Sequence, residues 1–351
     1  MNITVLYVGS SLLAPLKNAE REINRAYKLN LRVAAYNFGG PLTESQWQDV
    51  EQDLSKSNLV FVIHVIEAEN GARLINVLER FRSVHKAVVV INCMPDLMRR
   101  TRMGSLDVAS LAGDRSNKRK SKTVTTLTAA GSWMGRQARG HREQKKANNH
   151  SHYTKLIDRL PGILKFIPTA GALTDAKHYL NLFCYFLQPT PANVQSMLLY
   201  ALKHYSGDKQ LQTIKVRIPQ PEKMPSVAIY HPDSPNLFES FAAYRQWYRG
   251  SLETDETIGL LLMRPQVISK TTKHYDALIH AIEAEGMSVI PALATLMDNR
   301  EAVSRFFIEP TIKNQKSKIK NRVSQIVSLT GFSFVGGPAM NDSEAAAKFL
   351  T

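Results

Sequence analysis

The hydrophobic and polar positions of the first hundred residues follow two patterns in turn. Short, nearly continuous apolar runs are typical of strands covered on both faces, and they are separated by stretches whose apolar residues recur at helical spacing. The runs lie at 2–8, 31–36, 58–65 and 87–92, and the helical stretches at 12–29, 43–54 and 70–82. Strands and helices that alternate in this way predict a parallel sheet with right-handed crossovers.

A second alternation of the same kind begins at Ser226. Its predicted strands lie at 226–230, 257–263, 288–292 and 325–329, and its predicted helices at 238–248, 274–285 and 298–307. The run at 325–329 has the length of a buried strand, and Gly336, Gly337 and Pro338 follow it as a turn. Between the two alternations, three helical patterns occupy 153–167, 175–187 and 190–205.

These patterns predict an α/β protein with two flavodoxin- or Rossmann-like parallel-sheet domains, joined by a flexible basic loop and a helical segment. The expected organisation is an N-terminal α/β domain at 1–104, a basic loop at 105–150, a helical segment at 151–205, a connector at 206–225 and a second α/β domain at 226–351. Because no returning strand follows the helix pattern that starts near Asn341, we expect this second domain to be incomplete.

The net charge of +15 is concentrated in one tract. Residues 99–146 hold 13 Lys and Arg against three acids, so only a small part of the excess lies elsewhere. Trp133 is the one aromatic residue within 115–146, and single-strand binders need several aromatic side chains on which bases can stack. A solvated loop is therefore favoured over a surface for phosphates or an anionic membrane, and no nucleic-acid partner is expected.

The sequence has no feature typical of a membrane protein or a secreted protein. No run approaches the roughly 20 apolar residues of a transmembrane segment, and residues 1–7 have the pattern of a first strand rather than a signal peptide. Cys93 and Cys184 are too few for a disulfide framework or a cysteine-only metal site. These features favour a reducing, cytoplasmic setting.

Common catalytic motifs are missing from the chain. It has neither the P-loop for ATP nor the glycine fingerprint for dinucleotides. The stretch from Gly331 to Val335, GFSFV, lacks the second glycine of a nucleophile elbow. His150 and His152 have no neighbouring carboxylate or thiolate, which favours a solvated pair over a metal clip. The sequence therefore predicts no catalytic residue and no metal ligand.

Five residues are candidates for ligand binding. His64 and Glu67 follow the third predicted strand, at the edge where open α/β sheets form their binding crevices. His231 follows the strand predicted at 226–230 and has the same status, within a tight Pro-Asp-Ser-Pro loop. Gly336 and Gly337 could hold an anion through backbone N–H groups before a helix. The alternatives are polar residues that complete hydrogen bonds at a loop and a turn that needs no ligand.

One stretch resembles a known family most specifically, namely 328–339, SLTGFSFVGGPA. The supporting stretches come in the same order along the chain: Met94-Pro95, Met98-Arg99, Arg102-Met103-Gly104, 159–168, His231-Pro232, Phe238-Glu239, His274-Tyr275, Glu283-Ala284 with Gly286, and Val289-Ile290-Pro291. Together they resemble the N-terminal region of the large, porphyrin-binding (H) subunit of magnesium chelatase, which is related to the large cobaltochelatase subunit.

The resemblance implies a role in the ATP-dependent insertion of Mg²⁺ into protoporphyrin IX, on the route to chlorophyll or bacteriochlorophyll. It implies AAA+ ATPase partner subunits that bind the ATP, a protoporphyrin ligand and the remaining C-terminal body of the H subunit. The compartment would be the cytoplasm, or the plastid stroma in a phototrophic eukaryote. Family members are several times longer, so no catalytic residue can be carried over, and this chain is not expected to be catalytic by itself.

Alternatives to this reading stay open. The chain could be a fragment of a cobaltochelatase-type large subunit, or a stand-alone tetrapyrrole-binding, regulatory or docking module without enzyme activity. Without the family, the pattern is that of a two-lobed α/β binder of a small ligand.

Overall fold

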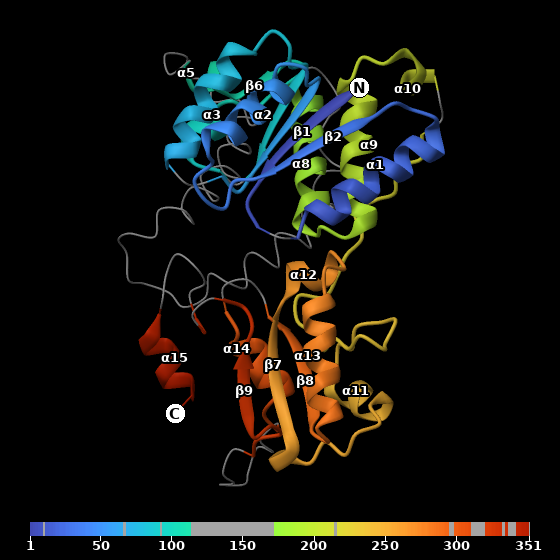
Figure 1. The fold of residues 1–351 in the computed structure, drawn as a ribbon, viewed down its shortest axis with the longest axis vertical. Helices are drawn as coiled ribbons and strands as arrows, with labels where there is room; N and C mark the ends of the chain where they lie inside the picture. Colours follow the sequence, from blue (N-terminus) through green and yellow to red (C-terminus); the bar gives the residue numbers. More distant parts are fainter. Residues whose placement is uncertain are drawn as a thin grey trace. The chain divides into compact units, whose positions relative to one another are not determined.

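The computed structural model describes residues 1–9, 11–65, 68–91, 93–113, 172–213, 216–294, 298–309, 320–331, 334–335 and 342–350. The described chain divides into two compact units, the first made of the residues up to 113 together with 172–222, the second beginning at Lys223 (Figure 1). The helix predicted at 153–167 and nearly all of the basic tract lie outside the described residues.

The first unit is built on the parallel sheet that the sequence predicts. Its strands are β1 (Asn2–Tyr7), β2 (Arg32–Asn37), β3 (Leu59–Ile63) and β4 (Ala87–Ile91), in the order β2-β1-β3-β4. Two short antiparallel strands, β5 (Arg102–Met103) and β6 (Leu106–Asp107), extend the sheet beyond β4. The strand order reverses between β1 and β3, which is where flavodoxin-like folds bind ligands at the carboxyl edge.

Three helices between these strands agree with the predicted pattern, namely α1 (Leu13–Tyr27), α2 (Glu44–Leu54) and α3 (Ala68–Arg80). The short helices α4 (Pro95–Met98) and α5 (Val108–Gly113) lie beyond β4, and both α5 and β6 fall at the start of the stretch 105–150 that was predicted to be a loop. The Thr43 hydroxyl accepts the backbone N–H of Gln46, whose side chain accepts the N–H of Thr43, so that α2 starts with a capping box. Pro95 occupies the first turn of α4, where its missing N–H is not needed.

Alternate residues of the strands face two separate cores. Val60 and Val62 of β3 join a cluster with side chains of α2 and α3, whereas Leu59 and Phe61 join a cluster with α1 on the other face. β3 is therefore covered on both faces, which accounts for its nearly continuous apolar sequence.

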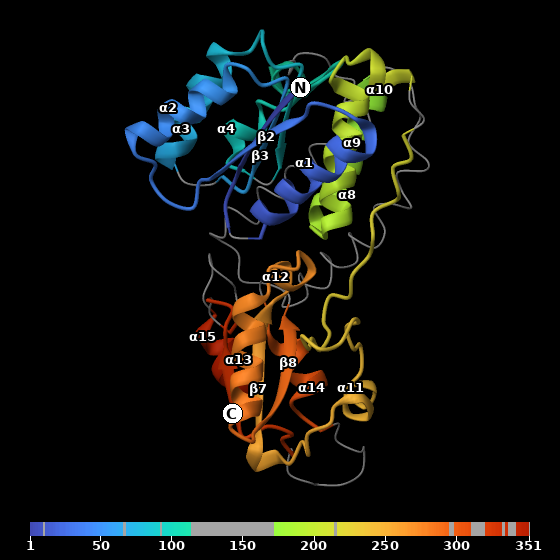
Figure 2. The ribbon, with the colours of Figure 1, turned by 45° about the vertical axis from the view of Figure 1, so that its right-hand side comes forward.

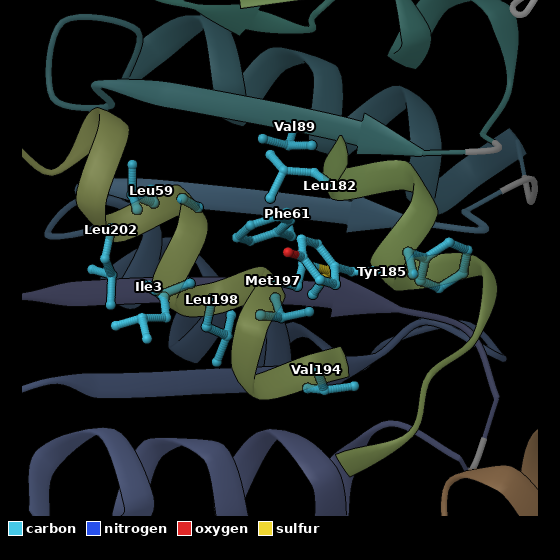
Figure 3. Packing of buried hydrophobic residues seen from close by; sticks show 14 of the residues in the cluster. Ile3, Leu59, Phe61, Val89, Leu182, Tyr185, Val194, Met197, Leu198 and Leu202 are labelled. Carbon is cyan, nitrogen blue, oxygen red and sulfur yellow. The ribbon is translucent and has the colours of Figure 1, made fainter. Parts of the chain in front are cut away.

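The helical segment of the sequence prediction is part of the first unit. The helices α8 (Ala172–Leu187) and α9 (Pro191–Tyr205) pack with α1 on the same face of the sheet, as Figure 3 shows for Leu182, Met197 and Leu198 beside Phe61. The hydroxyl of Tyr179 donates to the backbone oxygen of Val90 at 2.8 Å, which ties α8 to β4. A short helix, α10 (Lys209–Thr213), follows α9.

The second unit holds a smaller parallel sheet. Its strands β7 (Thr257–Met263), β8 (Ser288–Ala294) and β9 (Gln325–Ser328) have the order β8-β7-β9. The remaining elements are α11 (Phe241–Trp247), the 3₁₀ turn η1 (Thr254–Glu256), α12 (Arg264–Ile268), α13 (Lys273–Ala284), α14 (Arg300–Phe306) and α15 (Ser343–Leu350). The helices α13 and α14 cover opposite faces of this sheet (Figure 2). Gly286 has φ +81° after α13, a left-handed conformation that is common for glycine at a helix end.

Two predicted strands differ from the structure. Residues 226–230 do not form a strand of the parallel sheet, because only Ile229 makes isolated antiparallel bridges, to Phe238 and Ala292. The strand at β9 does form, but it is not buried: its four residues are exposed, with Ile326 at 39% and Val327 at 38%. An apolar run indicates a strand, whereas its burial depends on distant neighbours that the run does not encode.

Candidate functional site

His64 lies at the carboxyl edge of the first sheet, directly after β3. Its backbone is left-handed, with φ +59°, and its N–H donates to the backbone oxygen of Ile91 at 3.0 Å. The imidazole meets the ring of Phe186 from α8 edge to face, with centroids 5.1 Å apart. A left-handed conformation is uncommon for a residue with a side chain, and such strain is concentrated at functional sites. His64 is therefore placed where the sequence predicts.

The loops next to His64 are held by the side chain of Asn37, the last residue of β2. Its Oδ1 accepts the N–H of Gly9 at 3.3 Å and that of Gly39 at 3.0 Å. Gly9 follows β1 with φ +111°, a conformation that favours glycine. Asn70 of α3 donates to the oxygen of Gly40 at 2.9 Å. The loops after β1 and β2 are thus fixed to one another at the carboxyl edge, and the loop after β1 borders the reversal of strand order between β1 and β3.

Two titratable groups at this edge, His64 and Cys93, are uncharged at neutral pH. Burial lowers the pKa of His64 to about 4, so its imidazole is neutral. Burial raises the pKa of the Cys93 thiol, after β4, to about 12. A neutral imidazole against an aromatic ring can accept a hydrogen bond or ligate a soft or borderline metal, but it is a weak base. The edge suits contact with an apolar, aromatic ligand.

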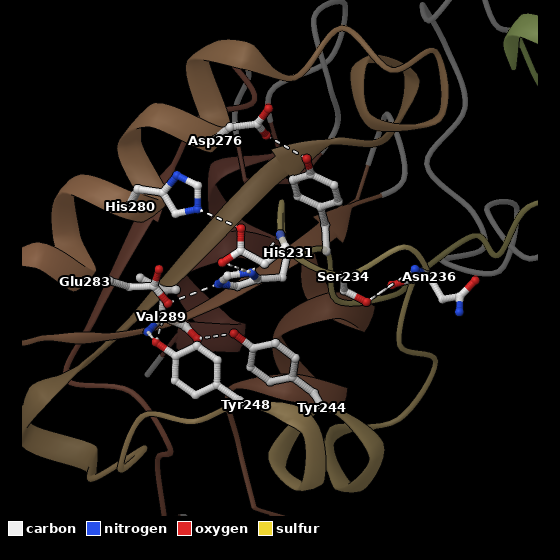
Figure 4. A network of polar contacts seen from close by, with 11 residues as sticks. His231, Ser234, Asn236, Tyr244, Tyr248, Asp276, His280, Glu283 and Val289 are labelled. Carbon is white, nitrogen blue, oxygen red and sulfur yellow. Dashed lines mark hydrogen bonds and ion pairs between the residues drawn. The ribbon is translucent and has the colours of Figure 1, made fainter.

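The second candidate histidine, His231, is the centre of a polar network in the second unit (Figure 4). It is 2% exposed, and its Nδ1 accepts the backbone N–H of Asp233 at 3.3 Å. Its Nε2 therefore carries the proton and donates to Oε1 of Glu283 at 3.0 Å. The hydroxyl of Tyr248 donates to the same oxygen at 2.7 Å. Both ring nitrogens are used inside the chain, which favours a structural role over direct ligation.

The position of His231 differs from the prediction. Tyr248 and Tyr244 hydrogen-bond to the backbone N–H and oxygen of Val289, which lies at the start of β8. The network around His231 is therefore at the amino-terminal end of β8, not at the carboxyl edge where crevices form. The cause is chain direction, because the antiparallel bridge between Ile229 and Ala292 leads the chain back toward the start of β8.

Aromatic side chains surround His231 and were not predicted as site residues. Trp247 meets the imidazole at 5.0 Å between centroids and is itself 37% exposed. His280 of α13 contacts Oδ1 of Asp233 at 3.2 Å on the exposed side of this network. Trp247 therefore offers a fluorescent reporter at the surface of the second unit. No local motif marks it, because its partners come from distant parts of the sequence.

The other three predicted site residues, Glu67, Gly336 and Gly337, lie outside the described residues. Within the described ranges, no group of three or more His, Cys, Asp or Glu side chains could hold a metal ion. Among the helices that the structure describes, none is long and apolar enough to cross a membrane.

Two family models match the chain in succession. Residues 2–180 match the domain of unknown function DUF3479, and residues 183–350 match the CobN/Magnesium Chelatase model. The chain therefore belongs to the DUF3479 family by its first half, and its second half carries a CobN/Magnesium Chelatase domain. The junction of the two matches falls within α8, so the second begins inside the first structural unit.

Curated relatives of the chain are magnesium-chelatase H subunits. That of Cereibacter sphaeroides is 29% identical over 298 residues, which are 85% of this chain and 22% of that protein. The chloroplastic subunit ChlH of Oryza sativa subsp. japonica is 26% identical over 349 residues, which are 97% of this chain and 23% of that protein. The chain thus spans about a fifth of the length of these relatives.

A solved structure was also found. The catalytic subunit of cobaltochelatase from Mycobacterium tuberculosis matches with a TM-score of 0.35 and 12% identity, over 85% of this chain and 16% of that one.

Proposed function

We propose that this chain acts as the amino-terminal part of the large, porphyrin-binding subunit of a magnesium chelatase. In that role it contributes to the insertion of Mg²⁺ into protoporphyrin IX and is not catalytic by itself. The observation that carries the proposal is the nearly continuous similarity to H subunits, over 97% of the chain in the rice relative. The two family models, one after the other, support the same assignment.

The partners follow from this assignment. AAA+ ATPase subunits would bind the ATP, and the rest of the H subunit would complete the porphyrin site. The cytoplasm, or the plastid stroma in a phototrophic eukaryote, would be the compartment. A cobaltochelatase-type subunit is the alternative within the family, and a magnesium role is favoured because the relatives described above are magnesium-chelatase subunits.

A domain replacement tests this function. The region of the Cereibacter sphaeroides H subunit that aligns with this chain would be replaced by the chain itself, and Mg²⁺ insertion would be assayed with that organism's ATPase partners. We expect the chimaera to regain activity that the same subunit loses when the region is deleted. A folded chimaera no more active than the deletion variant would contradict the proposal. Assays with Co²⁺ in place of Mg²⁺ would separate the two branches of the family.

Within this function, the edge around His64 is the part of the chain proposed to contact the porphyrin. The apolar face of a macrocycle can pack against the imidazole of His64 and the ring of Phe186. Neither His64 nor Cys93 carries a charge that this contact would bury. Titration of the chain with deuteroporphyrin, followed by quenching of tryptophan fluorescence, measures this contact directly. Trp47 packs in the first unit and Trp247 in the second, so Trp47→Phe and Trp247→Phe variants, each made in a Trp133→Phe background, show which unit binds.

Saturable one-to-one quenching that is weakened in His64→Asn, and unchanged in His274→Asn, would support the contact. Asparagine is chosen because it tolerates the left-handed backbone of His64, and His274 is an exposed histidine of α13. If the folded chain does not bind deuteroporphyrin, the first unit has no such contact, and a docking module within the H subunit becomes the preferred role.

A further inference from the structure

The two sheets of this chain share one connectivity. In the first unit, β1, α1, β2, α2, β3 and α3 follow one another, and the strands have the spatial order β2-β1-β3. In the second unit, β7, α13, β8, α14, β9 and α15 follow one another with the order β8-β7-β9, apart from the short α12 after β7. All strand pairs in both sets are parallel. By position, β9 corresponds to β3 and α15 to α3.

The two units differ at the next step. In the first unit, α3 leads to β4. This strand pairs in parallel with all five residues of β3, along the outer edge of β3, which is the edge that faces away from β1. All residues of β3 are buried between its neighbouring strands and the helices on both faces. In the second unit, among the residues that the structure describes, no strand pairs with the outer edge of β9 (Figure 1).

The outer edge of β9 has the properties of an interface. Ile326 and Val327 are adjacent in a strand, so their side chains point to opposite faces of the sheet, and both are more than a third exposed. The strand, QIVS, contains no Lys, Pro or acidic residue. Natural proteins use such residues to protect open edges, and an edge without them is a template for pairing with another strand.

We propose that the outer edge of β9 binds one further β-strand, parallel to β9, in the place that β4 takes beside β3. The occupant is a strand from the part of an H subunit that this chain does not contain, and this assignment rests on the function proposed above. Two observations select that occupant. The relatives are four to five times as long as the aligned region, since it makes up 22% or 23% of them. A parallel strand after a right-handed crossover through a helix such as α15 would lie beside β9.

Hydrogen exchange of the β9 segment tests the proposal. The chain would be co-expressed with the Cereibacter sphaeroides H subunit lacking the aligned region, and the isolated complex would be compared with the chain alone. We expect exchange of the β9 amides to slow by about tenfold or more in the complex. Val327→Lys should weaken the complex by about tenfold or more, because it places a charge at the edge that must be covered. Met287→Lys, at a side chain of similar exposure before β8, is the matched control and should have little effect.

Each outcome has a separate meaning. If a complex forms while β9 exchanges as fast as in the free chain, the edge is not the docking site, although the assignment to an H subunit stands. If the chain alone forms a dimer that Val327→Lys dissociates, the occupant is a second copy and the proposal is wrong. If the truncated subunit does not fold, the same exchange measurement is made on the domain-replacement chimaera. There, an unprotected β9 in an active chimaera overturns the inference, and an inactive, folded chimaera overturns the proposed function.

Discussion

Nε2 of His231 lies 3.0 Å from Oε1 of Glu283, and this contact joins the loop after Tyr230 to the last turns of α13. The same oxygen accepts the hydroxyl of Tyr248, which follows α11. One carboxylate therefore holds three segments that are distant in sequence. Because His231 is buried, its N–H has to be paired inside the protein.

Glu283→Ala should destabilise the second unit. The substitution removes the acceptor for both His231 and Tyr248, and we expect the free energy of unfolding to fall by about 1 to 2 kcal/mol, as for other buried donors left without a partner. Urea denaturation measures it, followed by the fluorescence of Trp247 in a background in which Trp47 and Trp133 are replaced by Phe. Glu285→Ala, at an exposed position two residues further on, is the control and should stay within about 0.5 kcal/mol of the unchanged chain. Equal effects of the two variants would show that the network does not support the fold.

Gly104→Ala should destabilise the first unit through a contact with Asp175. Gly104 has φ +55°, and a Cβ there would lie 2.6 Å from Oδ2 of Asp175, which also accepts the N–H and hydroxyl of Ser105. We expect a loss of about 2 kcal/mol in the free energy of unfolding, of which about half reflects the left-handed backbone alone. Gly40→Ala, where a Cβ has open space, should be close to neutral.

A double-mutant cycle separates the two contributions at Gly104. In an Asp175→Ala background the steric part is absent, so Gly104→Ala should cost about 1 kcal/mol, the backbone part alone. An effect of Gly104→Ala that is the same in both backgrounds would mean that Asp175 moves aside without loss.

The sequence was sufficient for features that are encoded locally. The apolar runs predict β1 to β4 and the helical spacing at 43–54 predicts α2, because both periodicities are local properties of the sequence. His64 was placed correctly because parallel strands end at the same edge of a sheet. Its left-handed backbone was not predicted, since no sequence pattern near it requires one.

Long-range relationships were not visible in the sequence. The pairing of His231 with Glu283 joins residues 52 positions apart, and periodicity carries no information about such contacts. The reversed direction of 226–230 was missed because a short apolar run does not specify whether it pairs in parallel. One signal was available: His231-Pro232 and Glu283-Ala284 both belong to the stretches that resemble the chelatase family, and the structure brings these two stretches together.

Both cysteine thiols should be unreactive in the folded chain. Burial raises the pKa of Cys93 and of Cys184 to about 12, so almost no thiolate is present at pH 7.5, and both side chains are buried. We expect a thiol-specific reagent to label neither residue in native buffer and both in urea. Lys56→Cys places a thiol at an exposed position and should add one rapidly labelled site. Rapid labelling of Cys184 in native buffer would show that α8 separates readily from the sheet.

His64 should make the stability of the first unit depend on pH. Burial lowers its pKa from 6.5 to about 4, so between these values the unfolded chain binds a proton that the folded chain does not. The free energy of unfolding therefore falls as the pH falls from 6.5 to 4, by at most about 3 kcal/mol from this residue. His64→Asn removes the titration and keeps the left-handed backbone accessible. Urea midpoints of the two proteins should accordingly converge, or cross, between pH 7.5 and pH 4.5, whereas a constant difference would mean that His64 is protonated equally in the folded and unfolded chains.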